Sequence, residues 1–336
     1  MTELILHDPL DMHLHLRDGK MLRTVAPLSA RFFSGALVMP NLVPPITDGT
    51  MMREYRTRIL DAVGNERFEP YMTLFFQPEY DFDFLAPLAE ELTAVKLYPA
   101  GITTNSEGGV RGFSVEELRP ALSAMSELGI PLCIHGESAG FVLDREAEFI
   151  PIYEELAVAF PELTIVMEHI TTAASVEALE RHPNLYATIT LHHLLITLDD
   201  VAGGMLQPHL FCKPIAKRPE DREALLRAAL EAHPKVMFGS DSAPHPRHAK
   251  EAPGCAAGVF TAPIALPALA ELFARHGKLE NLQHFVSTNA KNIYEIEPPA
   301  KKIRLTDTPM RVPERYGDVV PMMAGEEIGW SVASVE

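Results

Sequence analysis

The sequence is poor in several kinds of residue, and each shortage narrows the class of protein it can encode. It contains only three cysteines in 336 residues, and they stand far apart, at Cys133, Cys212 and Cys255. An odd number of widely spaced cysteines is no disulfide framework and favours a reducing compartment. Because no two of them form a C-x-x-C pair, the sequence gives little support for a cysteine-based zinc site.

Basic residues and long apolar runs are also scarce. The chain has 29 lysines and arginines against 46 acidic residues, a net charge of −17, so we expect no nucleic-acid partner. A locally positive site for a small anion is compatible with this charge. No run approaches the ~20 apolar residues of a membrane span, and the first residues lack the pattern of a secretory signal. We therefore expect a cytoplasmic protein without membrane contacts.

The chain contains instead eight short apolar runs, most of them rich in β-branched or aromatic residues. Near-continuous apolar runs are typical of strands that are buried on both faces, as in a parallel sheet. The runs cover residues 10–16, 35–41, 71–77, 94–100, 131–137, 163–170, 185–194 and 235–245.

Helical segments are predicted between these strands, for example over residues 115–129, over 218–233, and over 175–182 with Ser175 as its cap. Eight strand–helix alternations predict an α/β fold, a (β/α)8 TIM barrel forming one domain over residues 1–336. The alternative is a doubly wound open sheet, but its early glycine-rich phosphate turn is missing. Extra C-terminal helices are expected over 262–277 and 281–294, followed by a tail from about residue 298.

Polar residues gather toward the C-terminal ends of the apolar runs. In a barrel these ends form one face, and that face holds the active site. The shared position is a stronger indication of function than any single motif. The residues are His13, His15, Asn41, Lys96, His135, His169 and Asp241.

The histidines among them predict a metal site. Side chains two apart on a strand point the same way, so His13 and His15 can grip one cation, although a packed or surface pair is the plainer alternative. His135 and His169 end two further runs. Four imidazoles at one rim are hard to explain by packing alone, because polar burial without partners is costly. Histidine and aspartate ligands suit Zn²⁺, with iron or manganese less favoured.

Asp241 and Lys96 each allow two interpretations. Asp241 can bind the metal and move a proton between water and a leaving nitrogen, or it can cap a following helix. Burial would lower the pKa of Lys96 and favour its free amine, which can react with CO₂ to give a carbamate that bridges two metals. The alternative for Lys96 is an ion pair with a carboxylate.

Seven segments, taken together, resemble the successive signatures of the dihydroorotases, in the single-domain bacterial form within the amidohydrolase superfamily. The resemblance runs from about residue 8 to about residue 295 and keeps the order of that family. The segments are "DMHLHLRD" (11–18), "MPNLVPP" (39–45), "KLYPAGITTNS" (96–106), "HGE" (135–137), "MEHITT" (167–172), "PHLFCKPIAKR" (208–218) and "GSDSAPH" (239–245).

The resemblance implies an enzyme that interconverts N-carbamoyl-L-aspartate and L-dihydroorotate, a step of pyrimidine synthesis. It implies two zinc ions, bridged by a hydroxide and by Lys96 as a carbamate. One ion would be bound by His13, His15 and Asp241, and the other by His135 and His169. By analogy with similar enzymes, we expect a homodimer.

Further residues would bind the substrate. Arg17 lies two positions past His15 and offers a bidentate fork for a carboxylate, unless it pairs with Asp18 instead. The loop 101–109 would close over the substrate, unless it is a plain surface turn. The resemblance adds side-chain contacts from Asn41, Thr103, Thr104 and His245 and backbone contacts from Lys213 and Ala257.

The sequence departs from the family at two points, and rival functions remain. Leu191 stands where relatives often have proline, and Lys213 where several have an apolar residue. The remaining histidines, including His7, His192, His193 and His209, are interpreted as structural or surface residues. Rival functions are a hydantoinase, a catalytically dead paralogue, and a metal-storing or scaffolding protein. The intact set of ligands and carboxylate-binding residues favours the active dihydroorotase.

Overall fold

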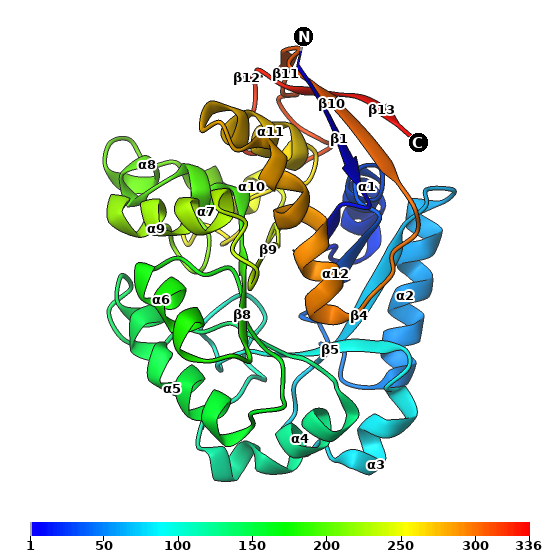
Figure 1. The fold of residues 1–336 in the computed structure, drawn as a ribbon, viewed down its shortest axis with the longest axis vertical. Coiled ribbons are helices and arrows are strands. Elements are labelled where there is room, and N and C mark those ends of the chain that lie inside the picture. The colour runs from blue at the N-terminus through cyan, green and yellow to red at the C-terminus, as the bar shows by residue number, and fades with distance from the viewer. Residues whose placement is uncertain (1) are drawn as a thin grey trace.

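A computed structural model describes residues 2–336, and its centre is a sheet of eight parallel strands that hydrogen-bond in chain order. Helices surround these strands on the outside (Figure 1). The strands are β2 (Leu10–Leu14), β3 (Gly35–Val38), β4 (Glu69–Phe75), β5 (Leu92–Leu97), β6 (Leu132–Ile134), β7 (Ile165–Met167), β8 (Leu185–Ile189) and β9 (Val236–Phe238).

The sheet closes where the residues after β9 meet β2. Asp241 N donates to His13 O over 2.8 Å, and His15 N donates to Ser242 O over 3.3 Å. Each predicted apolar run overlaps one of the eight strands; six runs contain their strand, while β4 and β5 each begin two residues before the run. The predicted (β/α)8 barrel is therefore confirmed, and the residues that close it belong to the predicted site.

Twelve α-helices connect or flank the strands within the described residues. They are α1 (Gly19–Ala30), α2 (Gly49–Val63), α3 (Phe82–Leu85), α4 (Val115–Leu128), α5 (Arg145–Ala159), α6 (Ala173–Arg181), α7 (Leu191–Leu195), α8 (Leu198–Ala202), α9 (Pro219–Leu230), α10 (Arg247–Lys250), α11 (Ala265–Arg275) and α12 (Asn289–Tyr294). Shorter helical turns are η1 (Ala86–Leu88), η2 (Pro208–Leu210), η3 (Leu279–Asn281) and η4 (His284–Thr288). None of the helices formed by residues 2–336 is long and apolar enough to span a bilayer.

The predicted helices are largely confirmed, with one cap corrected. Helix α4 begins after Ser114, whose hydroxyl accepts from Glu117 N, and ends at Gly129, whose φ of 66° suits glycine. Helix α6 begins two residues before the predicted start. Its cap is Thr172 and not Ser175, because Thr172 Oγ1 accepts the hydrogen bond from Ser175 N.

The seventh apolar run was predicted as strand to residue 194, and this is wrong in its second half. Strand β8 ends at Ile189, and Thr190 Oγ1 accepts from His193 N over 3.0 Å, which starts helix α7. His192 and His193 therefore sit on a short helix. Both are buried, so the surface alternative does not apply to them.

The tail contains strands that the sequence did not predict. Strand β10 (Lys302–Thr306) lies between β1 (Glu3–His7) and β13 (Ser331–Val335) in an antiparallel sheet, and β11 (Met310–Arg311) pairs with β12 (Glu327–Ile328). Figure 1 shows both chain ends at this sheet. Leu6, Ile303 and Leu305 are buried on its inner face, so the two ends of the chain stabilise each other.

The barrel interior is filled by apolar side chains from alternate strand positions, among them Leu10, Met12, Leu37, Met237 and Cys133. Tyr294 of α12 packs against this cluster, and its hydroxyl lies 3.3 Å from Cys133 Sγ. This packing fills the interior beneath the carboxyl ends of the strands, where the polar residues lie.

Candidate active site

The first histidine pair and Asp241 meet where the barrel closes. Asp241 Oδ1 lies 3.1 Å from His15 Nε2 and 3.6 Å from His13 Nε2. One ligand atom from each of the three residues lies within 4.8 Å of the others, and all three residues are buried. The prediction that His13 and His15 point the same way is confirmed.

The second pair lies beside the first. His135 Nδ1 is 3.2 Å from His169 Nε2, and the rings of His13 and His169 are 4.8 Å apart between centroids. Four imidazoles from the ends of three strands therefore form one cluster. Burial lowers the pKa of His15 to about 4 and lowers the pKa of His169, so these rings are neutral and able to bind a cation.

Asp241 caps no helix. The next helix, α10, begins after Pro246, five residues further on. Burial opposes ionisation of Asp241, but the hydrogen bond with His15 and the charge of His13 outweigh it and lower the pKa of the carboxyl. Asp241 is therefore an anion at neutral pH, as a ligand or proton acceptor has to be.

Lys96 is fully buried on β5. Its Nζ has no hydrogen-bond partner among residues 2–336 and lies 5.0 Å from the centre of the Tyr98 ring. The predicted alternative, an ion pair with a carboxylate, is therefore not formed. Burial lowers the pKa of Lys96, which favours a reactive free amine.

Sequence reasoning missed the carboxylates behind the histidines. Glu168 Oε2 lies 2.7 Å from His13 Nδ1, and Thr188 Oγ1 donates to the same oxygen over 2.5 Å. Glu137 Oε2 lies 2.9 Å from His135 Nε2. Carboxylates at the outer ring nitrogen orient histidines that bind metals, and they leave the inner nitrogen free. Glu137 lies two residues after its partner His135 in the motif "HGE", so this motif was an available signal. Glu168 contacts the distant His13 and not its neighbour His169, so the motif "MEHITT" gave no such signal.

A second missed residue, Asp11, fixes the segment that carries Asp241. Ser240 N donates to Asp11 Oδ1 over 2.7 Å, and Ser240 Oγ donates to Asp11 Oδ2 over 2.6 Å. These bonds join β2 to the turn after β9. They place Asp241 opposite His13 and His15.

A small, partly open cavity lies above the histidines, with about 350 Å³ of empty space that includes open solvent. It brings together most of the predicted site residues. It is lined by His13, His15, Arg17, Asn41, Tyr98, Thr103, Thr104, His135, His169, Lys213, Asp241, Ala243, Ala257 and Gly258. Tyr98, Ala243 and Gly258 were not predicted.

Arg17 and His245 form a polar corner of this cavity. Arg17 Nε donates to Pro244 O over 3.2 Å, and its Nη2 lies 3.1 Å from His245 Nε2. Asp18 instead accepts from Arg58 Nε and caps α1, so it is not the partner of Arg17. His245 Nε2 is also 2.9 Å from Ala257 O. One ring nitrogen cannot accept from Arg17 and donate to Ala257, so this corner lacks an acceptor.

The loop 101–109 is held against the cavity at two points. Asn41 Nδ2 donates to Thr104 O, and Asn105 Nδ2 donates to Asn41 O, both over 3.0 Å. Lys213 Nζ donates to Ile102 O over 2.8 Å. Lys213, for which only a backbone role was predicted, therefore also holds the loop through its side chain.

The barrel and the histidine cluster at its rim define an amidohydrolase, and residues 52–296 match the family model described as Amidohydrolase. Among curated proteins, the dihydroorotase of Helicobacter pylori strain P12 is 44% identical over 99% of both chains, and that of Helicobacter hepaticus is 47% identical over 98% of this chain and 97% of its own. The chain belongs to the dihydroorotase family, amidohydrolases that act on a cyclic amide.

Solved structures agree with this assignment. A dihydroorotase from Campylobacter jejuni is 55% identical with a TM-score of 0.95, covering 99% of this chain and 98% of its own. A Saccharomyces cerevisiae dihydroorotase in complex with 5-fluoroorotic acid is 34% identical with a TM-score of 0.92 and the same coverage. An L-hydantoinase from Arthrobacter aurescens is 17% identical with a TM-score of 0.84, which shows a shared fold only.

Proposed function

We propose that this chain is a zinc-dependent dihydroorotase that interconverts L-dihydroorotate and N-carbamoyl-L-aspartate in pyrimidine synthesis. Its main support is the buried Lys96 amine, which has no partner in the described chain and stands on β5 beside β6, the strand that leads to His135. A buried amine beside four imidazoles and a carboxylate is unfavourable unless other groups complete the site.

The residues present fit two divalent cations. His13, His15 and Asp241 would hold one, and their ligand atoms already lie within 4.8 Å of each other. His135 and His169 would hold the second. His15 Nδ1 and His169 Nδ1 are buried without partners among residues 2–336. Imidazole and carboxylate donors are those that Zn²⁺ prefers.

Lys96 would join the two sites as a carbamate. Its neutral Nζ would attack the carbon of CO₂, forming an N–C bond while one C=O π bond opens, and the nitrogen would release one proton to solvent. The product would carry a single negative charge shared by two oxygens in place of a neutral amine. Those oxygens are of the kind that divalent cations accept as ligands.

The substrate carboxylate fits the corner formed by Arg17 and His245. A carboxylate supplies the acceptor that this corner lacks, so Arg17 can donate to the substrate while His245 keeps its bond to Ala257. Asn41 would add a donor from its amide. The yeast relative was solved with 5-fluoroorotic acid, which carries a carboxylate on a pyrimidine ring.

Bound divalent cations would activate a water for attack and polarise the ring amide carbonyl. The anionic Asp241 would accept the proton of that water at its carboxylate and deliver it to the ring nitrogen as the C–N bond breaks. Thr103 and Thr104, at the cavity wall, would keep bulk water out. In ring closure the same groups act in reverse.

The chain would act as a homodimer in the cytoplasm, with residues 1–336 forming one domain and a small molecule as its ligand. Support for the single domain comes from the terminal sheet, where β10 pairs with β1 across the length of the chain. Light scattering on the purified protein would give its mass, and a monomeric value would contradict the dimer.

An assay of dihydroorotate hydrolysis, followed by ultraviolet absorbance, tests the catalytic assignment. Activity is expected from zinc-loaded protein, loss of activity after chelation, and recovery after zinc is returned. Asp241→Asn is the matched variant, because it keeps the shape of the side chain but removes the proton acceptor. Absence of metal-dependent turnover in folded, zinc-loaded protein would favour the scaffolding alternative.

A further inference from the structure

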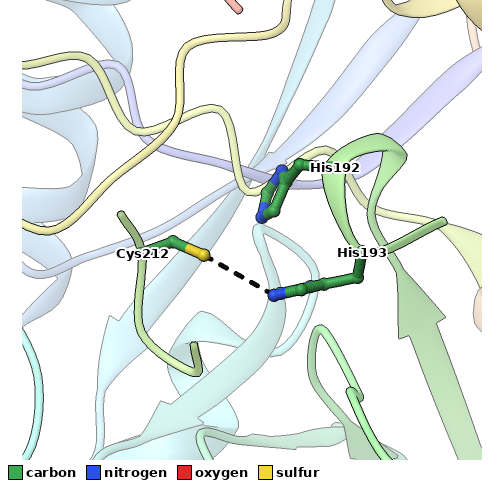
Figure 2. A group of neighbouring side chains, drawn as sticks. All are labelled: His192, His193 and Cys212. Atoms are coloured by element: carbon green, nitrogen blue, oxygen red, sulfur yellow. Dashed lines mark hydrogen bonds between the residues drawn. The ribbon is translucent and has the colours of Figure 1, made fainter. Parts of the chain in front are cut away.

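A second group of metal-binding side chains lies outside the cavity. His192 and His193 come from α7, and Cys212 follows the turn η2, so two separate segments contribute (Figure 2). One ligand atom from each residue lies within 4.8 Å of the others. All three side chains are buried, with 0%, 2% and 0% of their surfaces exposed.

Hydrogen bonds hold two members of this group in place. His193 Nε2 lies 3.6 Å from Cys212 Sγ, and both atoms contact Pro214 O, over 3.1 Å and 3.2 Å. His193 Nδ1 lies 2.9 Å from Thr190 Oγ1. The ring of His193 is therefore fixed with Nε2 facing Cys212.

His192 is different, because neither of its ring nitrogens has a hydrogen-bond partner within residues 2–336. Figure 2 shows one of these nitrogens facing the space beside Cys212 and His193. A fully buried imidazole without partners is destabilising, because its ring nitrogens have lost their hydrogen bonds to water and gained none in the protein. A ligand that occupies the space would remove this penalty.

We propose that His192, His193 and Cys212 form a third metal site, distinct from the pair of sites at the cavity, which binds Zn²⁺ or a similar thiophilic cation. One thiolate and two imidazoles are ligands that zinc commonly takes in proteins. Hard cations such as Mg²⁺ and Ca²⁺ prefer oxygen ligands and are not expected there.

Binding needs two proton movements, and the surroundings provide for one of them. Cys212 loses its thiol proton to solvent as the metal–sulfur bond forms. On His193 the proton moves from Nε2 to Nδ1, and Nδ1–H then donates a hydrogen bond to Thr190 Oγ1. An outer hydrogen bond of this kind is usual for histidines that bind metals.

The bound cation would tie α7 to the segment that leads into the cavity. Cys212 directly precedes Lys213, whose Nζ holds Ile102 of the loop 101–109. Filling the third site would therefore stiffen the wall that carries Lys213. Because the ligands are buried, exchange of this cation is expected to be slow.

Cobalt absorption tests the site without any measurement of catalysis. Full-length protein loaded with Co²⁺ is expected to show a thiolate-to-cobalt charge-transfer band from Cys212. The band reports on the third site alone, because the cavity site is proposed to contain no cysteine ligand. Cys212→Ser should lose the band, and its bound metal should fall from three to two ions per chain. Cys133→Ser and Cys255→Ser are matched controls that should keep both. A wild-type protein without the band, or a band that survives Cys212→Ser, would overturn the third site.

His192→Leu gives a second test whose sign depends on the role of His192. Leucine removes a buried unsatisfied group, so the metal-free variant should be at least as stable as metal-free wild type. If His192 only fills space, the zinc-loaded variant should also be at least as stable as zinc-loaded wild type. If His192 binds metal, the variant should gain less stability from added zinc than wild type does, as measured by thermal unfolding. His276→Leu, at an exposed position, is the control. An equal gain from zinc in wild type and His192→Leu would refute the assignment.

Discussion

Lys96 and Lys250 are buried to nearly the same degree, with 0% and 3% of their surfaces exposed, yet their amines differ in hydrogen bonding. Lys250 Nζ donates to the carbonyls of Phe211, Ala256 and Gly258 over 2.9, 2.8 and 2.7 Å. Lys96 Nζ has no hydrogen-bond partner in the part of the chain that the structure describes. Burial alone therefore does not separate a structural lysine from a functional one, but the number of hydrogen bonds that its amine donates does.

Lys301 extends the comparison to the tail. Its Nζ donates to Ala30 O and to Phe33 O, so it joins the C-terminal segment to the end of α1 and to the segment that precedes β3. Lys250 and Lys301 fasten backbone segments, and their amines are satisfied by backbone carbonyl oxygens. The open amine of Lys96 lies instead among side chains that bind cations, where a later reaction can complete it.

The largest effect is expected from Lys96→Met, which removes the open amine and keeps most of the volume. Turnover should fall by at least ~10³-fold, since a bridging ligand of both metals is lost. Bound zinc should also decrease. The variant should stay folded, because no hydrogen bond of Lys96 is broken. Steady-state kinetics, metal analysis and circular dichroism check the three results, and retained activity would exclude the bridging role.

Arg17→Met tests a guanidinium whose hydrogen-bond donors are only partly used within the protein. Loss of a charged contact to the substrate carboxylate should lower kcat/KM by ~10²-fold, about 2.7 kcal/mol. Metal content should not change, because Arg17 contacts His245 and Pro244 and none of the proposed ligands. Arg58→Met, which removes the partner of Asp18, is the control. A loss of zinc from Arg17→Met would assign Arg17 a structural role.

Lys250→Met tests the satisfied lysine. Three buried carbonyls would lose their common donor, which should reduce the free energy of unfolding by about 2 kcal/mol. Urea denaturation measures this loss, and Lys278→Met, at an exposed position, is the control. A larger loss of stability from Lys96→Met than from Lys250→Met would reverse the distinction between the two lysines.

The residues at the rim of the barrel could be predicted because a residue's place along its strand also fixes its place in the folded barrel. A polar residue at the end of a buried parallel strand faces the same opening as its counterparts on the other strands, and His13, His135 and His169 followed this rule. Glu168 was overlooked because its role depends on His13, 155 positions away in the chain. Its own neighbour His169 suggested no such contact.

Other features depend on contacts that no local pattern contains. The pairing of β1 with β10 joins Glu3 to Thr306, and both strands are short and partly polar. Helix α7 was missed because its residues are apolar enough for a strand, and the Thr190 cap decides the outcome. His192 and Cys212 stand twenty positions apart, with a helix and a turn between them, so their approach appears only in the folded chain.

The smallest effect is expected from the pH response of His245, a base that the fold keeps neutral. Burial and the neighbouring Arg17 lower the pKa of His245 to about 3, from an ordinary value of 6.5. As pH falls from about 6.5 toward 3, the unfolded chain gains a proton that the folded chain does not bind, so the folded state loses stability. His245→Gln should lose less stability than wild type between pH 7 and pH 5, in urea denaturation at both values. His276→Gln, at an exposed position, should behave as wild type. If His245→Gln and wild type lose the same stability between pH 7 and pH 5, the fold does not hold His245 neutral. His245 would then resemble Lys250, a buried base whose charged form is stabilised by hydrogen bonds.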